Sequence, residues 1–147
     1  MEHELFFDGT IKKYSWVIKN ESKTVHQKRE HPPAYLSGGK LDVKNNEESK
    51  FISLHVGIYW GLGVFIIKDH DTVNVMCDSK NMYEILTNNK KTNSQIVNDK
   101  IYFINQLTEH RNLKINYEII KPESNLATEL LSTNGKNPAS RNSRGFV

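Results

Sequence analysis

The spacing of the apolar residues changes along this chain, and that change is the strongest constraint on its fold. In the first thirty residues apolar and polar side chains alternate, as in residues 14–19 (Y-S-W-V-I-K). Beyond residue 45, apolar residues recur at intervals of three and four, at Phe51, Leu54, Ile58, Leu62 and Phe65. Alternation is typical of β-strands, and the longer spacing is typical of an amphipathic helix. Both patterns appear again further on, so the sequence predicts an α/β fold.

The predicted elements follow a regular order, which is three strands, a long helix, a strand, two helices, a strand and a helix. The strands are expected over residues 4–8, 14–19, 23–30, 72–77 and 113–120. The helices are expected from residue 45 or 46 to Phe65 and over residues 80–86, 94–107 and 125–131. A Pro-Pro and Gly-Gly segment predicts a loop over residues 31–39. We therefore expect one domain over residues 1–132 and a polar, mobile tail over 133–147.

Composition excludes several classes of protein. The chain has 147 residues, which suits one domain, and its single cysteine, Cys77, allows neither an internal disulfide nor a cysteine-rich zinc site. The longest apolar stretch, residues 56–67, is too short to span a bilayer, and the acidic start is unlike a signal peptide. The net charge of +3 permits contact with a polyanion. We expect a cytoplasmic monomer that does not bind membranes.

Acidic residues fall at four matching places in this order of elements. Asp8 and Asp78 each end a predicted strand, so they meet at one edge of the sheet if the two strands are parallel. Glu47 and Glu48 begin the long helix, and Glu129 lies in the last one. Clustered carboxylates need a cation between them, and oxygen ligands suit Mg²⁺ or Mn²⁺. The sequence therefore predicts a metal site formed by these acids.

Four short motifs in this order resemble the type 1 ribonuclease H family over roughly residues 5–132. They are Asp8-Gly9-Thr10 after the first strand, Asn45-Asn46 before the long helix, Asp78-Ser79 after the fourth strand, and Pro122 to Leu131 before and within the last helix. The resemblance implies a mixed five-stranded sheet, three antiparallel strands and then parallel ones, flanked by helices. By its spacing from Asn125, Glu129 falls on the last acidic position of the family pattern.

The resemblance implies a metal-dependent endonuclease that hydrolyses the RNA strand of an RNA/DNA hybrid with two Mg²⁺ or Mn²⁺ ions. The catalytic and metal-binding residues are then Asp8, Glu48 (or Glu47), Asp78 and Glu129. Contacts to the hybrid are expected from Asn45, Asn46, Ser79 and Asn81, whose other interpretation is helix capping. Lysines of the second half, namely Lys80, Lys90, Lys91 and Lys100, are either a contact to the DNA strand or an ordinary solvated surface.

One departure from the family pattern leaves a second function open. Strict counting from the two asparagines puts Ser49 at the position of the helix carboxylate, and counting back from Gly57 puts Lys50 there. Only a shift of one or two residues brings Glu48 or Glu47 into that role. An ammonium at this position would replace one ion. The alternative is therefore a degenerate ribonuclease H-like module that binds nucleic acid or a protein partner without cleavage.

Two other activities of related folds fit less well. A proofreading exonuclease needs an acid two residues after the first Asp, where this chain has Thr10. A transposase or integrase needs a Glu about 35 residues after Asp78, where Leu113 stands.

His55 lies on the apolar side of the long helix, which is more typical of a core histidine than of a metal ligand.

Overall fold

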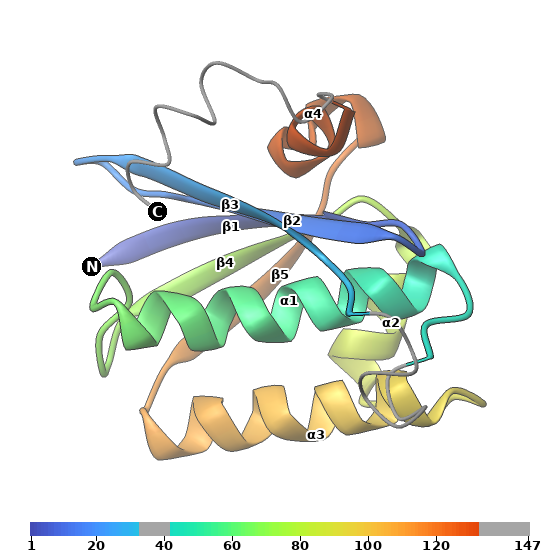
Figure 1. The fold of residues 1–147 in the computed structure, drawn as a ribbon. Helices are drawn as coiled ribbons and strands as arrows, with labels where there is room; N and C mark the ends of the chain where they lie inside the picture. Colours follow the sequence, from blue (N-terminus) through green and yellow to red (C-terminus); the bar gives the residue numbers. More distant parts are fainter. Residues whose placement is uncertain (33–41, 133–147) are drawn as a thin grey trace.

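The computed structural model describes residues 1–32 and 42–132, which fold around one five-stranded sheet (Figure 1). The strands are β1 (Glu2–Gly9), β2 (Lys13–Lys19), β3 (Thr24–Glu30), β4 (Thr72–Cys77) and β5 (Lys114–Ile119). Their order across the sheet is β3-β2-β1-β4-β5. The first three are antiparallel neighbours, whereas β4 runs parallel to both β1 and β5. This confirms the predicted mixed sheet.

The register of β1 and β4 determines where the functional edge of the sheet lies. Leu5 is opposite Val75 and Phe6 is opposite Met76, and the two strands are parallel. Both strands therefore deliver their carboxyl ends to the same edge of the sheet. Asp8 is near the end of β1 and Asp78 directly follows β4, so the two carboxylates belong to one edge, as the sequence predicts.

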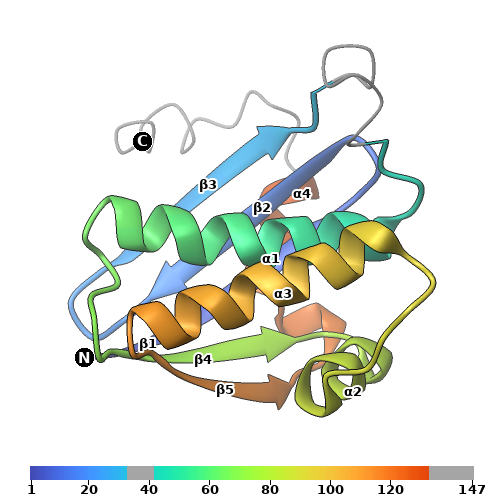
Figure 2. The same cartoon turned by 90° about the horizontal axis from the view of Figure 1, so that it is seen from below.

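Helices cover the sheet on two faces. The helices are α1 (Asn46–Gly63), α2 (Lys80–Asn88), α3 (Gln95–His110) and α4 (Leu126–Ser132). Helices α1 and α3 lie side by side on one face, and α4 lies on the other, against β1 and β2 (Figures 1 and 2). Side chains of Asn45, Ser79 and Ser94 accept a hydrogen bond from the first turn of α1, α2 and α3 respectively.

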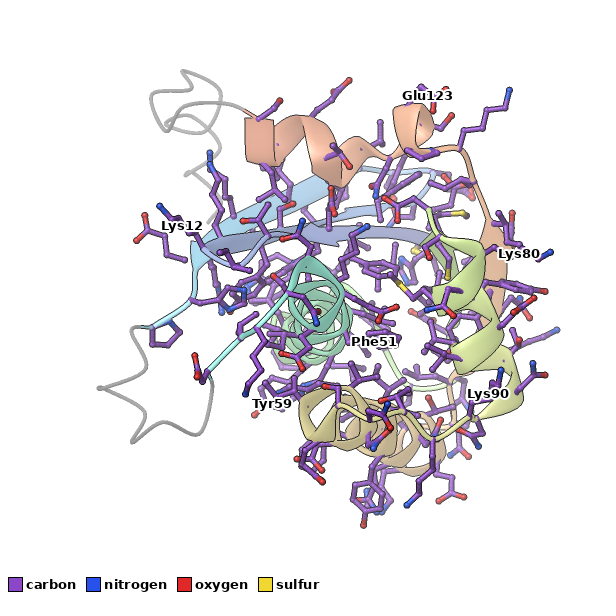
Figure 3. All side chains as sticks on the ribbon, turned by 90° about the vertical axis from the view of Figure 1, so that its right-hand side faces the viewer. Lys12, Phe51, Tyr59, Lys80, Lys90 and Glu123 are labelled. Atoms are coloured by element: carbon purple, nitrogen blue, oxygen red, sulfur yellow. The ribbon has the colours of Figure 1, made fainter. Side chains whose placement is uncertain are left out.

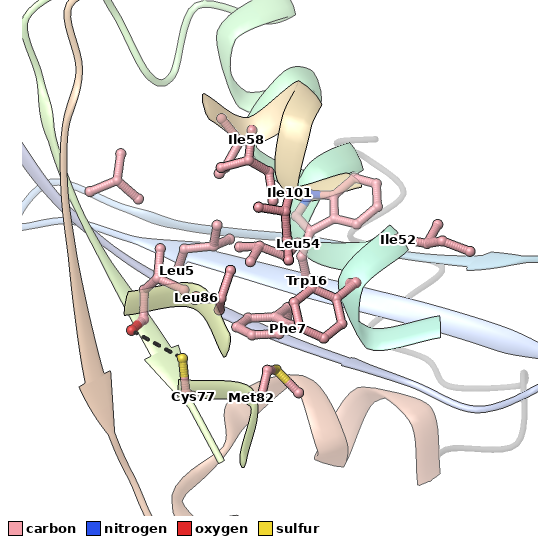
Figure 4. Close-up of a cluster of buried hydrophobic side chains, with 14 of the residues drawn as sticks. Leu5, Phe7, Trp16, Ile52, Leu54, Ile58, Cys77, Met82, Leu86 and Ile101 are labelled. Atoms are coloured by element: carbon pink, nitrogen blue, oxygen red, sulfur yellow. Dashed lines mark hydrogen bonds between the residues drawn. The ribbon is translucent and has the colours of Figure 1, made fainter. Parts of the chain in front are cut away.

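The apolar core lies between the sheet and the layer of α1 and α3 (Figure 4). Its fully buried members include Leu5 and Phe7 of β1, Trp16 of β2, and Leu54 and Ile58 of α1. Helix α1 can lie close to Trp16 because residue 57 is glycine, since a Cβ there would be 3.1 Å from the Trp16 ring. The apolar spacing from Phe51 to Leu62 thus marks the side of α1 that faces the sheet. The expected last member, Phe65, does not belong to it, because α1 ends at Gly63 and Phe65 is 74% exposed.

Most differences from the predicted elements concern their ends. Strand β1 is longer than expected because it is central and pairs with neighbours on both sides from Glu2 or Glu4 onward. Residues 122–124 form a short 3-10 turn before α4, which was not expected. The predicted tail and most of the predicted loop, residues 33–41, lie outside the described residues. Among the described helices, none combines the length and apolarity needed to cross a membrane.

Candidate functional site

The carboxylates of Asp8 and Asp78 meet at the carboxyl edge of the sheet, and a lysine ammonium contacts both. Nζ of Lys50 lies 3.1 Å from Oδ1 of Asp78 and 3.7 Å from Oδ1 of Asp8. The side chains of both aspartates are about one-tenth exposed or less, while that of Lys50 is 22% exposed. Lys50 comes from the second turn of α1. The cation of this cluster is therefore supplied by the chain itself.

Two neutral side chains hold the far oxygens of the two carboxylates. Nδ2 of Asn125 donates to Oδ2 of Asp78 at 2.9 Å and to the Phe7 carbonyl at 3.0 Å. Oγ1 of Thr128 donates to Oδ2 of Asp8 at 2.5 Å. Asn125 is 1% exposed, and its side-chain oxygen accepts from the backbone of Ala127, which fixes the start of α4. Both aspartates are thus also held in place by residues 125–128, at and just before the start of α4.

Close contact between β1 and α1 brings Lys50 to this edge. A Cβ added to Gly9 would lie 2.2 Å from Oγ of Ser49 and 2.8 Å from the Ser49 carbonyl carbon. Only glycine permits this approach, because the second contact is to backbone that has no rotamer to change. The Gly9 amide also donates to Oδ1 of Asp8 at 2.8 Å.

Glu48 is directed away from the two aspartates. Its Oε1 accepts from the Lys44 amide at 2.8 Å and its Oε2 accepts from Oγ of Ser94 at 2.6 Å. Residues advance by about 100° around a helix, so positions 48 and 50 lie about 200° apart on α1. Lys50 therefore faces Asp8 and Asp78, while Glu48 is buried against the start of α3. The structure does not bring Glu48 together with the two aspartates.

Glu47 and Glu129 do not contact the two aspartates either. Oε2 of Glu47 accepts from Nδ2 of Asn81 at 2.8 Å, which joins the first turns of α1 and α2. Glu129 is exposed, and the residue before it, Thr128, makes the contact to Asp8. Of the four predicted acids, the structure therefore brings together Asp8 and Asp78.

The predicted nucleic-acid contacts lie around this edge, with part of their polar groups already used. The side-chain oxygens of Asn45 and Ser79 cap α1 and α2, and Asn81 binds Glu47. Asn46 is exposed at the first position of α1. The exposed Lys80 begins α2 and the exposed Lys90 follows it, and both lie on the same side of the molecule (Figure 3).

The residues present do not fit a site for two divalent ions. In the part of the chain that the structure describes, no three His, Cys, Asp or Glu side chains lie together in a way that suits a metal ion. Two carboxylates converge, and the ammonium of Lys50 contacts both of them where a cation would bind. A divalent cation would have to displace this ammonium and would then find two carboxylates as its charged ligands.

Sequence reasoning alone did not assign roles to Asn125 and Thr128. Asn125 carried a usable signal, because it stands in the motif that leads into the last helix. Thr128 carried none, since the sequence places the acid of that motif one residue later. The sequence leaves four positions open for the helix side chain, from Glu47 to Lys50, and the structure places Lys50 against the aspartates.

Comparison with known proteins identifies the fold. No family model matches the sequence, and no curated protein does. The RNase H1 of the halophilic archaeon Halobacterium salinarum NRC-1 superimposes with a TM-score of 0.64 at 13% identity, covering 89% of this chain and 94% of that one. An N-terminal RNase H domain from Mycobacterium tuberculosis gives 0.63 at 17% identity, with coverages of 87% and 91%. LC11-RNase H1, whose structure contains an RNA/DNA hybrid, gives 0.62 at 14%, with coverages of 88% and 91%. The chain therefore has the ribonuclease H-like fold.

Proposed function

We propose that this ribonuclease H-like domain binds a nucleic-acid duplex at the carboxyl edge of its sheet and does not cleave it by a metal-dependent reaction. The observation that carries the proposal is the contact of Lys50 with both Asp8 and Asp78. The ammonium lowers the charge of this cluster from −2 to −1 without any bound ion. A phosphate backbone can approach the edge more closely as a result, whereas a divalent ion meets competition for its ligands.

Three further observations support a nucleic-acid ligand. Lys80, two residues after Asp78, is exposed, as are Lys90 and Lys91 after α2, and cations of this kind release counterions when they contact phosphates. Asn46 offers an exposed amide beside the same edge. A protein of similar fold was solved with an RNA/DNA hybrid, so a hybrid is the first duplex to test.

The alternative is the metal-dependent endonuclease that the resemblance implies. It requires the Lys50 side chain to leave the aspartates so that Mg²⁺ or Mn²⁺ can bind there. The side chain is 22% exposed, so it is not fully enclosed by the fold. Cleavage of a hybrid is therefore measured alongside binding, and it decides between the two functions.

Binding is tested by fluorescence anisotropy of a labelled RNA/DNA hybrid, with duplex DNA and duplex RNA as further probes, in the presence of a chelator. We expect binding that weakens with salt, and a smaller salt dependence when Lys80, Lys90 and Lys91 are replaced by Gln. The matched control replaces three exposed lysines at the opposite end of the sheet by Gln, namely Lys23, Lys68 and Lys114.

Cleavage is tested with the same labelled hybrid in Mg²⁺ and in Mn²⁺. We expect the RNA strand to stay intact. Metal-dependent cleavage that is lost in Asp8→Asn would replace our proposal by the endonuclease. Lack of binding to any of the duplexes at low salt, or an equal effect of the control lysines, would contradict the nucleic-acid function.

A further inference from the structure

An open pocket lies between α1 and α3, on a part of the surface that the proposed function does not use. Its volume is about 320 Å³, and it is lined by His55, Tyr59, Phe103, Gln106, Leu107 and His110. Tyr59 is 63% exposed and Phe103 is 43% exposed, so two large aromatic rings face solvent. Ligand pockets of proteins start at about this size and are mostly apolar with a few polar groups.

The pocket is separate from the edge that holds Lys50. Tyr59 follows Lys50 by nine residues, which is about 13 Å along α1 and about 180° around it. Tyr59 accordingly lies on a different side of α1 from Lys80 and Lys90 (Figure 3). A ligand bound at the sheet edge beside Lys50 therefore does not also fill this pocket.

A cation without a carboxylate partner lies beside the pocket, against two of its lining residues. Nζ of Lys100 is 3.4 Å from Nδ1 of His55 and 5.9 Å from the centre of the Phe103 ring. Among the described residues, no carboxylate lies within ion-pair distance of this ammonium. Burial lowers the pKa of Lys100, against the weaker opposite effect of Asp99. Holding a partly buried ammonium without an anion is costly, and an anionic ligand would remove that cost.

The hydrogen bond between Lys100 and His55 also fixes the state of the imidazole. An ammonium only donates, so Nδ1 of His55 accepts and Nε2 carries the proton. Burial, and then the charge of Lys100, lower the pKa of His55 to about 4, so the ring is neutral at pH 7. The pocket thus combines aromatic rings and a neutral imidazole, and the Lys100 ammonium lies beside them.

We propose that this pocket binds a single unpaired nucleotide, with its base against Phe103 and Tyr59 and its phosphate on Lys100. Aromatic faces accept the flat face of any base, and the ammonium accepts the phosphate. Gln106 and His110 carry hydrogen-bond donors and acceptors. The edge of a base can pair with such groups, whereas a bare phenyl ring cannot. The nucleotide is either a free nucleoside monophosphate or an unpaired residue of a strand, because both present the same chemistry.

The two sources are distinguished by titrating the ¹⁵N-labelled protein with AMP and, separately, with a short single-stranded oligonucleotide that contains 2-aminopurine. We expect amide shifts at residues 55–59 and 103–110, with no shift at residues 8, 50 and 78 in the AMP titration. Similar affinity for both probes indicates a free nucleotide. Tighter binding of the oligonucleotide, with quenching of the 2-aminopurine, indicates a strand.

Matched pairs of variants test which side chains make the site. Phe103→Ala and Lys100→Gln should each weaken binding of the better probe by about five-fold or more. The controls Phe65→Ala and Lys114→Gln carry the same changes at exposed positions outside the pocket lining and should leave affinity unchanged. The spectrum of each variant also reports whether it is folded.

Three results would overturn this inference. The first is no shift at the pocket with either probe at millimolar concentration. The second is binding that Phe103→Ala and Lys100→Gln leave intact. The third is a pocket that binds neither nucleotide probe but binds phosphotyrosine, which is a phenyl ring with a phosphate. That result would assign the pocket to a protein ligand instead.

Discussion

The ammonium of Lys50 in α1 lies 3.1 Å from a carboxylate oxygen of Asp78, the residue that directly follows β4. This contact joins the long helix to the carboxyl edge of the sheet, and the nearby carboxylate of Asp8 extends it to β1. A helix side chain thus neutralises part of the negative charge that the two parallel strands bring together. The chemistry of this edge depends on the residue at position 50.

Replacing Lys50 by Glu should create a site for a divalent ion. Three carboxylates would then meet at the edge, and oxygen ligands of this kind bind Mn²⁺ and Mg²⁺. We expect Mn²⁺ binding by Lys50→Glu in electron paramagnetic resonance, and an added stability of about 2.7 kcal/mol at a free ion concentration one hundred times its dissociation constant.

Two control variants separate a built site from general attraction of cations. Lys50→Gln removes the ammonium without adding a ligand, and Lys80→Glu adds the same charge at an exposed position. Neither should bind Mn²⁺ as Lys50→Glu does. Equal binding by Lys80→Glu would mean that the three carboxylates at the edge do not converge.

Among the neutral residues at this edge, Asn125 should contribute most to the stability of the fold. Its amide donates to Asp78 and to the Phe7 carbonyl, and its oxygen accepts from Ala127, all in a buried position. Asn125→Ala leaves these groups without partners, which should lower the free energy of unfolding by about 2–3 kcal/mol. Urea denaturation measures this, with the exposed Asn46→Ala as a control expected within about 0.5 kcal/mol of wild type.

Gly9→Ala should destabilise the fold and disturb the cluster together. The added Cβ would meet both the side chain and the backbone of Ser49, so α1 must move away from β1. We expect a loss of about 1–3 kcal/mol in thermal or urea unfolding. At Gly63 of the same helix no heavy atom lies within 4 Å of the added Cβ, so Gly63→Ala should be neutral or stabilising. A neutral Gly9→Ala would contradict the close packing described for this edge.

His55 should make stability depend on pH in the weakly acidic range. Burial and then Lys100 lower its pKa to about 4 in the fold, against 6.5 as the ordinary value. Between these values the unfolded chain binds a proton that the folded chain does not, so stability falls as pH falls from 6.5 toward 4. The loss should be on the order of 2–3 kcal/mol.

The variant His55→Gln isolates this contribution from that of other titrating groups. Urea denaturation of wild type and variant is compared at pH 7 and at pH 4.5. The wild type should lose more stability between the two values than the variant does. Equal losses would mean that His55 is protonated as readily in the fold as in the unfolded chain.

The arrangement of elements was predictable because each element carries a local signal. The alternation in residues 72–77 gave the bounds of β4 without error, and asparagine and serine caps marked the starts of α1, α2 and α3. Two hairpins make β3 run in the same direction as β1, and the crossover helix α1 from β3 to β4 then makes β4 parallel to β1. The 3-10 turn at residues 122–124 was not predictable, because a three-residue turn has no periodicity of apolar residues to detect.

The residues that the strands contribute to the candidate site were predictable from the sequence, whereas the residue that α1 contributes was ambiguous. Strand-end residues such as Asp8 and Asp78 are placed by sheet topology, which is coarse enough to infer from sequence. The side chain that faces them from α1 depends on the helix phase, where one residue changes the direction by about 100°. The sequence leaves that phase open between Glu47 and Lys50, and it is settled by the packing of Gly9 on Ser49.

The position of β1 in the sheet also has a consequence for how the chain folds. On one side β1 pairs with β2, which follows after a short turn, so that hairpin can form early. On its other side β1 pairs with β4, about seventy residues later in the chain. During synthesis one side of β1 therefore stays unpaired until residues 72–77 have left the ribosome, and pairing over such a separation is slow. Nascent chains that end before β4 should accordingly be those most prone to aggregate or to need a chaperone.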